Sequence, residues 1–269
     1  MDSTLRAAQI TKNLNTQRFG RSMEILDHTV STNSYLRSKA ADTELSEGFV
    51  VAALTQSGGR GRRAQVFASP AGGLYFSLLL RPKLPARENA IITVLTAVAI
   101  CRGIEETAGV QAAIKWINDV YIEDKKLCGI LAESTVDGGT GRFGSVVLGI
   151  GVNVNSRLRD FPPALRGTVT TLRELTGNEI SRSKLLAVIL NHLEKLIDGL
   201  GDPLIIADAM AEYRRRSFIL GREIEIISSA GNYLAKAVDI DDKGRLAVRT
   251  ADENIILLNS NEVRVRTST

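Results

Sequence analysis

The sequence predicts a two-part α+β protein, in which a large unit of mixed helices and strands is followed by a small all-β unit. From Glu24 onward, short stretches rich in Val, Ile and Leu alternate with helical stretches. After Arg216 the pattern changes to short alternating segments separated by turn residues. A length of 269 residues is sufficient for one sizeable domain and one small domain.

Residues 1–22 are expected to form a helical extension, because Ile10, Leu14 and Phe19 are spaced among polar residues as in a short helix lying on the body of the protein. Residues 23–216 are expected to form the main domain. Its predicted strands are 49–54, 74–80, 111–117, 119–122, 129–133 and 146–154. Its predicted helices are 32–40, 89–108, 182–199 and 203–216.

The last two predicted helices have distinct surfaces. The helix at 182–199 places Leu185, Ile189 and Leu193 on one face, which indicates a stripe that faces the core. The helix at 203–216 ends in three arginines, 214–216, which complement the negative end of the helix dipole. A nucleic-acid-binding patch is the alternative interpretation of these arginines.

Residues 217–269 are expected to form a small antiparallel barrel. The predicted strands are 223–227, 233–240, 245–250 and 254–258, and the turns between them are 231–232, 242–244 and 252–254. Short strands at such even spacing are typical of small barrels.

The composition excludes several classes of protein. A net charge of +4, from 34 basic and 30 acidic side chains, is too small to indicate a nucleic-acid-binding protein by itself. No stretch approaches the roughly 20 apolar residues that cross a bilayer, and no signal peptide is recognised at the start, so we expect a cytoplasmic protein without a membrane contact. Cys101 and Cys128 lie in apolar segments, which predicts buried thiols rather than a disulfide.

The most informative segment is a glycine- and arginine-rich stretch at residues 55–63, directly after the predicted strand 49–54. Glycines let the backbone turn and present N–H groups, and arginines offer planar donors, so the segment suits phosphate or carboxylate oxygens. A solvated basic loop and an RNA-binding arginine-glycine tract remain alternatives. The segment is neither a Walker loop nor a dinucleotide-binding GxGxxG motif.

A second group of polar residues lies around a predicted hairpin. Asp119 and Lys126 are expected on neighbouring antiparallel strands, close enough to share one ligand, although a surface salt bridge is the alternative. Gly129, beside the lysine, would permit close approach of a ligand to the backbone. A third segment, 149–155, places glycines and asparagines within a strand and is weak evidence by itself.

Together these segments resemble the biotin protein ligase family, over nearly the whole chain from Met23 to the end. The following motifs occur in the order seen in that family: Ser31-Thr32-Asn33, Gly59-Arg60-Gly61-Arg62-Arg63, Ser69-Pro70 with Gly72-Gly73-Leu74-Tyr75-Phe76-Ser77, Lys115-Trp116-Ile117-Asn118-Asp119, Lys126-Leu127-Cys128-Gly129-Ile130-Leu131-Ala132-Glu133 and Gly149-Ile150-Gly151-Val152-Asn153. Each motif is weak alone, and their order makes the resemblance specific.

The resemblance implies a class II synthetase-like catalytic domain, with a mixed sheet flanked by helices, and an SH3-like barrel from about Ser217. It implies an ATP-dependent biotin-[acetyl-CoA-carboxylase] ligase, which forms biotinyl-5'-AMP and transfers biotin to a lysine of a biotin carboxyl carrier protein or domain. Only 30 residues precede Ser31, so we expect a short form without a DNA-binding domain or specific DNA binding. The oligomeric state, monomer or homodimer, is open. A lipoate ligase and a non-catalytic nucleic-acid-binding protein are the rivals.

The resemblance also implies roles for individual residues. Lys126 would be the central catalytic residue, assisted by Arg62, and Asp119 would bind Mg²⁺. Biotin would be bound by Ser31, Thr32, Asn33, Gln56, Arg60, Gly61, Arg62, Lys126 and Gly129. ATP and the adenylate would be bound by Arg60, Arg62, Lys115, Trp116, Asn118, Lys126 and Asn153.

Two positions depart from the family pattern. Ile117 stands where the family usually has proline, and Phe67 stands where tryptophan is common. We expect the first to alter the bend at a strand end and the second to keep an aromatic surface near the arginines. Neither removes a charged group, so the departures bear on the geometry of the site rather than on the activity.

Overall fold

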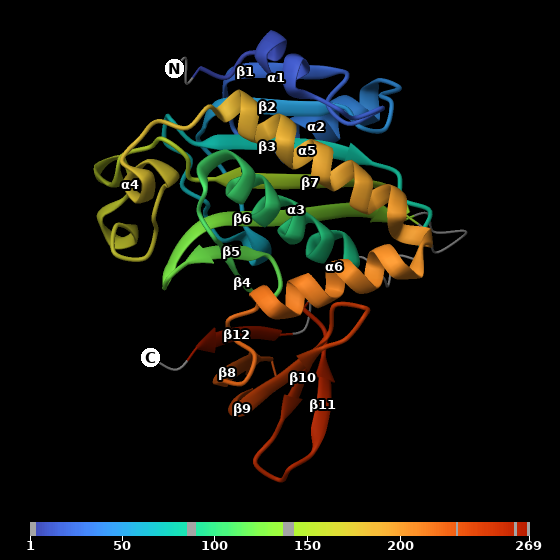
Figure 1. Ribbon diagram of the computed structural model, residues 1–269, viewed down its shortest axis with the longest axis vertical. Helices are drawn as coiled ribbons and strands as arrows, with labels where there is room; N and C mark the ends of the chain where they lie inside the picture. The colour runs from blue at the N-terminus through green and yellow to red at the C-terminus, as the bar shows by residue number, and fades with distance from the viewer. Residues whose placement is uncertain (1–3, 85–89, 137–142, 230, 261–262, 268–269) are drawn as a thin grey trace.

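A seven-stranded sheet forms the centre of the computed structural model, which describes residues 4–84, 90–136, 143–229, 231–260 and 263–267 (Figure 1). The strands are β1 (Met23–Thr29), β2 (Val50–Gln56), β3 (Leu74–Leu80), β4 (Ala113–Lys115), β5 (Asp119–Ile122), β6 (Lys125–Val136) and β7 (Phe143–Val152). Their order in the sheet is β1-β2-β3-β7-β6-β5-β4. Because β1 and β2 are parallel and the other neighbours are antiparallel, the sheet is mixed, as expected.

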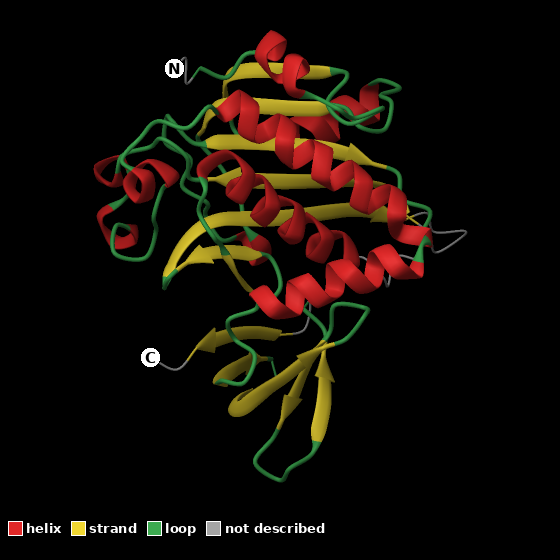
Figure 2. Cartoon of the chain, in the orientation of Figure 1, coloured by secondary structure: helices red, strands yellow, loops and turns green. Residues whose placement is uncertain are grey.

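Helices cover both faces of this sheet (Figure 2). On one face lie α3 (Ala90–Ala108), α5 (Arg182–Asp198) and α6 (Pro203–Arg216), and on the other lies α2 (Thr32–Asp42). Two short helices, α1 (Ala7–Asn13) and α4 (Leu172–Thr176), complete the domain together with 3₁₀ turns at Arg62–Ala64, Leu158–Asp160, Pro163–Leu165 and Gly199–Gly201. Every residue of β3 is buried, because a central strand covered on both faces has no solvated side.

The N-terminal segment is fixed to α5 by a buried carboxylate. Glu194, which is 5% exposed, accepts hydrogen bonds from the backbone N–H groups of Gln17, Arg18 and Phe19 at 2.6, 2.8 and 2.8 Å. A buried charge is tolerated only with such partners. The predicted core stripe of α5 is confirmed, since Leu185, Ile189 and Leu193 are fully buried.

A separate five-stranded antiparallel sheet follows, in the order β11-β10-β9-β8-β12 (Figure 1). Its strands are β8 (Glu223–Ser228), β9 (Gly231–Ile240), β10 (Leu246–Arg249), β11 (Ile255–Leu258) and β12 (Val263–Thr267). Alternate residues such as Ile224, Ile226, Ala237 and Val248 are buried on its inner face. The small all-β unit predicted after Arg216 is therefore confirmed.

Specific contacts place the small sheet against the main domain. The indole N–H of Trp116 donates to the carbonyl of Gly244 at 2.9 Å, and the backbone N–H of Phe218 donates to the carbonyl of Ile114 at 3.2 Å. Arg214 donates to the carbonyl of Ile240 at 2.6 Å. As a result β12, the last strand of the chain, lies beside the β4–β5 end of the large sheet (Figure 1).

Several elements differ from the sequence prediction. β1, β12 and α4 were not predicted, and the strand expected at 111–117 is shortened to β4, whereas that at 129–133 lengthens into β6. The sequence of β1 shows no apolar strand pattern, because β1 is an edge strand in which no residue is buried. The expected helix start at Asn89 lies outside the described residues. The boundaries at 22/23 and 216/217 remain predictions.

Two further expectations concern particular side chains. Arg216 pairs with Glu105 and Glu212 at 2.7 and 2.8 Å, and Arg214 pairs with Asp242 at 2.6 Å, so these arginines join elements of the fold. Both cysteines are buried free thiols. Within the described ranges, every helix is too short or too polar to cross a membrane.

Candidate active site

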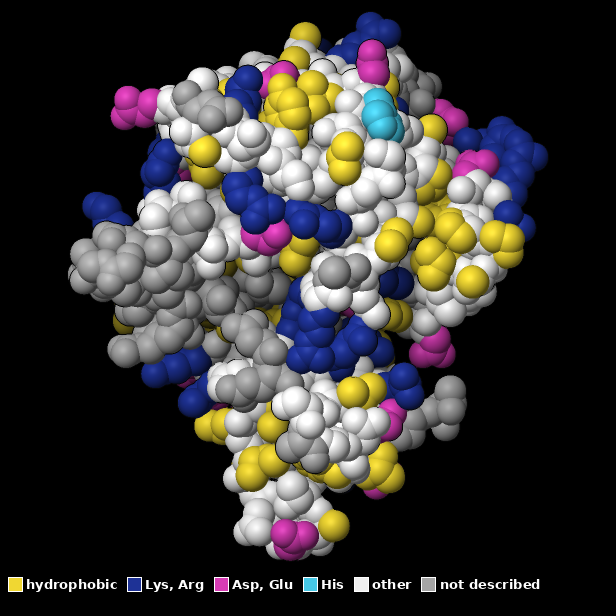
Figure 3. Space-filling model, turned by 180° about the vertical axis from the view of Figure 1, so that it is seen from behind, with side chains coloured by type: hydrophobic (Ala, Val, Ile, Leu, Met, Phe, Trp, Pro, Cys, Tyr) yellow, Lys and Arg dark blue, Asp and Glu magenta, His cyan; other side chains and the backbone are white. Residues whose placement is uncertain are grey.

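A cavity of about 410 Å³ opens on the face of the large sheet that carries α2. Its rim includes the arginine loop, which we define as residues 57–68, and part of β12. Lys and Arg side chains gather in the middle of this face (Figure 3). All the residues predicted for the site line this one cavity: Ser31, Thr32, Asn33, Gln56, Arg60, Gly61, Arg62, Lys115, Trp116, Asn118, Asp119, Lys126, Gly129 and Asn153.

Lys126 is the second residue of β6, and its ammonium is paired with Asp119 of β5 at 2.6 Å. The two strands are antiparallel neighbours, as predicted. The ammonium also lies 5.9 Å from the centre of the Phe67 ring, and the backbone carbonyl of Lys126 accepts from the amide of Asn153 at 3.4 Å. The lysine is thus held in one place by its backbone and by its charge.

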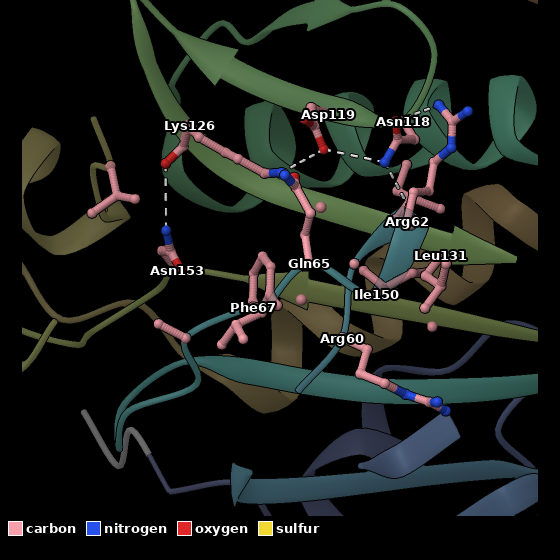
Figure 4. A pocket seen from close by; sticks show the side chains of 18 of the residues that line it. Arg60, Arg62, Gln65, Phe67, Asn118, Asp119, Lys126, Leu131, Ile150 and Asn153 are labelled. Atoms are coloured by element: carbon pink, nitrogen blue, oxygen red, sulfur yellow. Dashed lines mark hydrogen bonds and ion pairs between the residues drawn. The ribbon is translucent and has the colours of Figure 1, made fainter. Parts of the chain in front are cut away.

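A row of hydrogen bonds connects this lysine with the arginine loop (Figure 4). Asn118 donates to Asp119 at 3.3 Å, and Arg62 donates to the amide oxygen of Asn118, also at 3.3 Å. A second nitrogen of Arg62 donates to the backbone carbonyl of Ser260, in the turn that follows β11 of the small sheet. The two parts of the protein therefore meet at the guanidinium of Arg62.

The guanidinium groups of the loop point to the sides of the cavity. Arg60 turns away from Lys126 (Figure 4), donates to the hydroxyl of Ser34 at 2.8 Å and lies 3.6 Å from the carboxylate of Glu133. Arg62 points to the opposite side, toward Asn118. Arg60 and Arg62 line the same cavity as Lys126, as predicted.

The wall expected to hold biotin is built at the start of α2. Ser31 caps the helix, and its hydroxyl accepts from the backbone of Ser34 at 3.5 Å. The side-chain oxygen of Gln56 accepts from the backbone and hydroxyl of Thr32 at 2.8 and 3.2 Å, and its NH₂ donates to Ser69 at 2.8 Å. Gln56 lines the cavity, and we expect the second hydrogen of its NH₂ to bind the ligand.

The side chain of Asn33 is hydrogen-bonded to the protein through both its nitrogen and its oxygen. Its amide nitrogen donates to Glu133 at 2.8 Å and to the carbonyl of Leu131 at 3.3 Å, and its oxygen accepts from Ser77 at 2.6 Å. Gly149 provides the necessary space, because a Cβ there would lie 2.2 Å from the Asn33 oxygen. We expect Asn33 to fix the wall of the cavity rather than to supply the main polar contact to a ligand.

The glycines of β6 and β7 make room for an aromatic ring of the protein itself. Gly129 and Gly151 are directly opposite in the ladder, and a Cβ on them would lie 3.0 and 2.5 Å from the ring of Phe67. Gly129 lines the cavity beside this ring, and its contact with a ligand stays a prediction. The expectation that Phe67 keeps an aromatic surface beside the arginines is met, and the peptide bond before Ile117 is cis.

Burial alters the titration of several lining groups. It lowers the pKa of Lys115, although the nearby Asp119 opposes the shift. Burial likewise lowers the pKa of the Arg62 guanidinium, which still leaves it charged. The Tyr121 hydroxyl has its pKa raised to about 12 by burial and then by Asp119, so it stays protonated at neutral pH. The lining contains four arginines, which stay charged, and one carboxylate, Asp119, so the cavity is cationic at pH 7.

The donor set bears on a metal ion. Among the described residues, His, Cys, Asp and Glu nowhere form a group of three that could hold one. In the cavity, Asp119 supplies a carboxylate, and the amide oxygen of Asn153 is buried without a hydrogen-bond partner in the described part of the chain. Mg²⁺ commonly uses one or two carboxylates and the phosphates of its substrate, so these groups fit an ion that enters with a nucleotide.

Comparison with known proteins decides the family. Residues 26–153 match the Biotin/lipoate A/B protein ligase family, and residues 219–266 match the Biotin protein ligase C terminal domain. The bifunctional ligase/repressor BirA of Bacillus subtilis (strain 168) is 34% identical over 245 residues, which cover 87% of this chain and 73% of that protein. The chain belongs to the biotin protein ligase family.

Other biotin protein ligases are similar over most of their length. The biotin--[acetyl-CoA-carboxylase] ligase of Mycobacterium tuberculosis (strain ATCC 25618 / H37Rv) is 28% identical over 254 residues, 91% of this chain and 90% of that protein. The structure of the biotin protein ligase from Aquifex aeolicus in complex with biotin and ATP superposes with a TM-score of 0.79 and 27% identity. The superposition covers 92% of this chain and 100% of the Aquifex aeolicus chain.

Some lining residues of this biotin protein ligase were not predicted. Phe161, Leu165, Thr168 and Val169 come from an irregular segment that is joined to the site by the backbone bond from Lys126 to the carbonyl of Thr168 at 2.8 Å. The sequence of this segment has neither helical nor strand periodicity, so its isolated apolar side chains were the only sign that it packs against the protein. Arg264, Val265, Tyr121 and Gln65 also line the cavity, and the alternation at 263–266 was the overlooked sign of β12.

Proposed function

We propose that this chain is an ATP-dependent biotin protein ligase that activates biotin and attaches it to a lysine of a carrier protein. Family membership supports the reaction, and the cavity supports the assignment of residues. The observation that carries the proposal is the Lys126 ammonium, fixed at 2.6 Å from Asp119 in a cavity bordered by the arginine loop. Biotin and ATP are the ligands of the related Aquifex aeolicus enzyme.

In the first step, a carboxylate oxygen of biotin attacks the α-phosphorus of ATP. The bond from that phosphorus to the bridging oxygen breaks, so biotinyl-5'-AMP and pyrophosphate are formed. Both reactants are anions, and a positioned ammonium offsets their repulsion and the charge that develops on the phosphorus. Lys126 is the group assigned to this task, and Asp119 orients its side chain.

The arginine loop supplies the second part of the machinery. Arg60 and Arg62 are anchored at the two sides of the cavity, and their donors suit a carboxylate or a phosphate. We expect the guanidinium of Arg62 to turn inward when the anionic substrates bind, while that of Arg60 stays beside Ser34 and Glu133 and offers its remaining N–H groups to the ligand. Closure of the loop would keep water from the mixed anhydride, which otherwise hydrolyses.

In the second step, the neutral amine of the carrier lysine attacks the carbonyl of biotinyl-5'-AMP. An amide forms, AMP leaves, and the amine proton passes to solvent. The partner is a biotin carboxyl carrier protein or domain of a biotin-dependent carboxylase. Cytoplasmic residence and the lack of specific DNA binding stay predictions, and the choice between monomer and homodimer stays open.

We expect magnesium to bind together with ATP. When bound it would neutralise part of the triphosphate charge and help pyrophosphate leave. Asp119 and the unpartnered oxygen of Asn153 are the groups of this chain that would face it. Because Asp119 is already paired with Lys126, its carboxylate would have to serve both cations.

Pyrophosphate exchange tests the function directly. Purified protein should exchange labelled pyrophosphate into ATP only when biotin is present, and Lys126→Ala should lower the exchange rate by roughly 10²–10³-fold, the usual cost of losing a group that stabilises developing charge. Lys125→Ala is the matched control, because this neighbour on β6 is exposed. Exchange without biotin would reject the assignment.

The same assay separates the nearest rival. A lipoate ligase would show exchange with lipoate and none with biotin. The match of residues 219–266 to the Biotin protein ligase C terminal domain favours a biotin ligase. Mass spectrometry of a carrier domain should then show one added biotinyl group after incubation with the chain, biotin and ATP.

A further inference from the structure

Glu133 lies on β6 just behind the arginine loop, and the proposed chemistry gives it no task. Its carboxylate accepts from the amide of Asn33 at 2.8 Å and lies 3.3 Å from a guanidinium nitrogen of Arg37. Both partners belong to α2. The carboxylate is therefore held in position by residues outside the loop, and an acceptor fixed in advance binds its donor at a lower entropic cost.

The same carboxylate faces the loop. A nitrogen of Arg60 lies 3.6 Å from it and donates to the hydroxyl of Ser34 at 2.8 Å. Arg60 therefore contacts two groups, the carboxylate of Glu133 on β6 and the hydroxyl of Ser34 on α2. The Arg60 and Glu133 side chains are 42% and 23% exposed, so the ion pair is partly screened and of moderate strength.

The two ends of the loop are joined to the body. The backbone N–H groups of Ser57 and Gly58 donate to the carbonyls of Thr29 and Val30 at 3.1 and 2.8 Å, and the Phe67 ring packs against two glycines of the sheet. Within the loop, the N–H of Gly61 donates to the carbonyl of Gln65 at 2.6 Å and that of Phe67 donates to the carbonyl of Gly59 at 2.8 Å. These bonds close the loop on itself without fixing it to the body. Between these ends, the side chain of Arg60 is bound on one side of the cavity and that of Arg62 on the opposite side, so the Arg60 contact helps to hold the middle of the loop.

We propose that Glu133 is a positioning residue, the catch that holds the arginine loop closed over the activated intermediate. This inference rests on the proposed function, because the intermediate it protects is biotinyl-5'-AMP. Each opening of the loop exposes the mixed anhydride to water or releases it. The strength of the catch therefore sets how much intermediate is lost before the carrier arrives, and it does so without a contact between Glu133 and the reacting atoms.

Hydrogen exchange in the ligand-free protein tests the catch without reference to catalysis. Glu133→Gln keeps the size of the side chain and removes its charge, so the amides of residues 59–67 should exchange about 3- to 5-fold faster, as expected for a partly exposed ion pair. Glu24→Gln is the matched control, because Glu24 pairs with Lys39 at 3.0 Å and ties the same helix to β1. Equal exchange in Glu133→Gln and the parent protein would overturn the proposal.

Release of the intermediate is the second readout. With no carrier present, Glu133→Gln should lose biotinyl-5'-AMP to solution about 3- to 5-fold faster, while biotin-dependent pyrophosphate exchange stays near the parent rate. Added salt should shrink the difference, since it screens the parent ion pair, and Glu133→Asp should restore part of the retention. Unchanged release, or a parallel fall in pyrophosphate exchange, would contradict the catch. Failure of the parent to form any adenylate would instead reject the proposed function, and the hydrogen-exchange result would stand by itself.

Discussion

At the scale of single residues, the cations of the cavity are compensated in different ways. Lys126 has a carboxylate at 2.6 Å, and Arg62 donates to an amide and a backbone carbonyl. Lys115 instead lies over the ring of Tyr121, 5.7 Å from its centre. Burial consequently lowers the pKa of Lys115, and the charge offered to the nucleotide depends on pH.

Lys115→Arg should change the alkaline side of the pH profile. Because the pKa of Lys115 is lowered, its proton is lost below the pH of an ordinary lysine, and kcat/KM for ATP should begin to fall there. Arginine stays charged, so the fall should move to higher pH in the variant. Pyrophosphate exchange measured from neutral to alkaline pH checks this, with Lys125→Arg as the exposed control. Superimposable profiles would contradict the role of Lys115.

The same shift has a consequence for folding. A lysine whose folded pKa lies below its unfolded pKa binds more protons in the unfolded state between those two values. The contribution of Lys115 to the free energy of unfolding therefore rises as pH increases through that interval. The site holds this cation at a cost at neutral pH, as expected for a group kept for ligand binding rather than for stability.

At the scale of elements, the pair β6–β7 forms the floor of the cavity. Glycines normally weaken a strand, but Gly129 and Gly151 face each other and Phe67 lies over both. The ring supplies the packing that the glycines lack. Because Phe67 belongs to the arginine loop, its contact with the two glycines also sets the distance between the loop and the sheet.

Gly151→Ala should disturb this floor. The new methyl group would lie 2.5 Å from the Phe67 ring, so the ring would have to move into the cavity. We expect a loss of about 1–3 kcal/mol in the free energy of unfolding and a higher KM for biotin. Thermal unfolding and steady-state kinetics measure both quantities. Gly201→Ala is the control, since a Cβ there meets nothing within 4 Å, and the same KM in both variants would argue against the arrangement.

At the scale of the whole molecule, the site is complete only where the two sheets meet. β12 contributes Arg264 and Val265 to the cavity, and the carbonyl of Ser260 accepts from Arg62. The bond from Trp116 to Gly244 fixes the orientation of the small sheet. A part of the chain that is distant in sequence therefore belongs to the proposed nucleotide end of the site.

Arg264→Ala tests this contribution. Loss of one cation near the triphosphate should raise KM for ATP by roughly 3- to 10-fold, as for a charge-assisted hydrogen bond, and leave KM for biotin nearly unchanged. Arg249→Ala is a suitable control, because Arg249 lies on β10 and pairs with the exposed Glu253 at 3.2 Å. Equal increases in both KM values would indicate a general disturbance rather than a contact with the nucleotide.

The sequence by itself determined the two-part division, most strands and helices, and a set of residues that line one cavity. These properties follow from local patterns: apolar periodicity, turn residues, and motifs in which glycine, arginine and lysine stand at fixed spacings. Every residue predicted for the site lines one cavity, because each motif lies on or next to a strand that leads to it.

The tertiary structure alone decided how those residues are arranged. No local pattern relates Glu133 to Arg60, Phe67 to the Gly129–Gly151 pair, or Arg264 to the cavity. Each of these contacts joins segments that are far apart in the chain and depends on strand register and on the packing of the two sheets. Local sequence encodes which groups are present, whereas long-range packing determines which partner each charge and each ring meets.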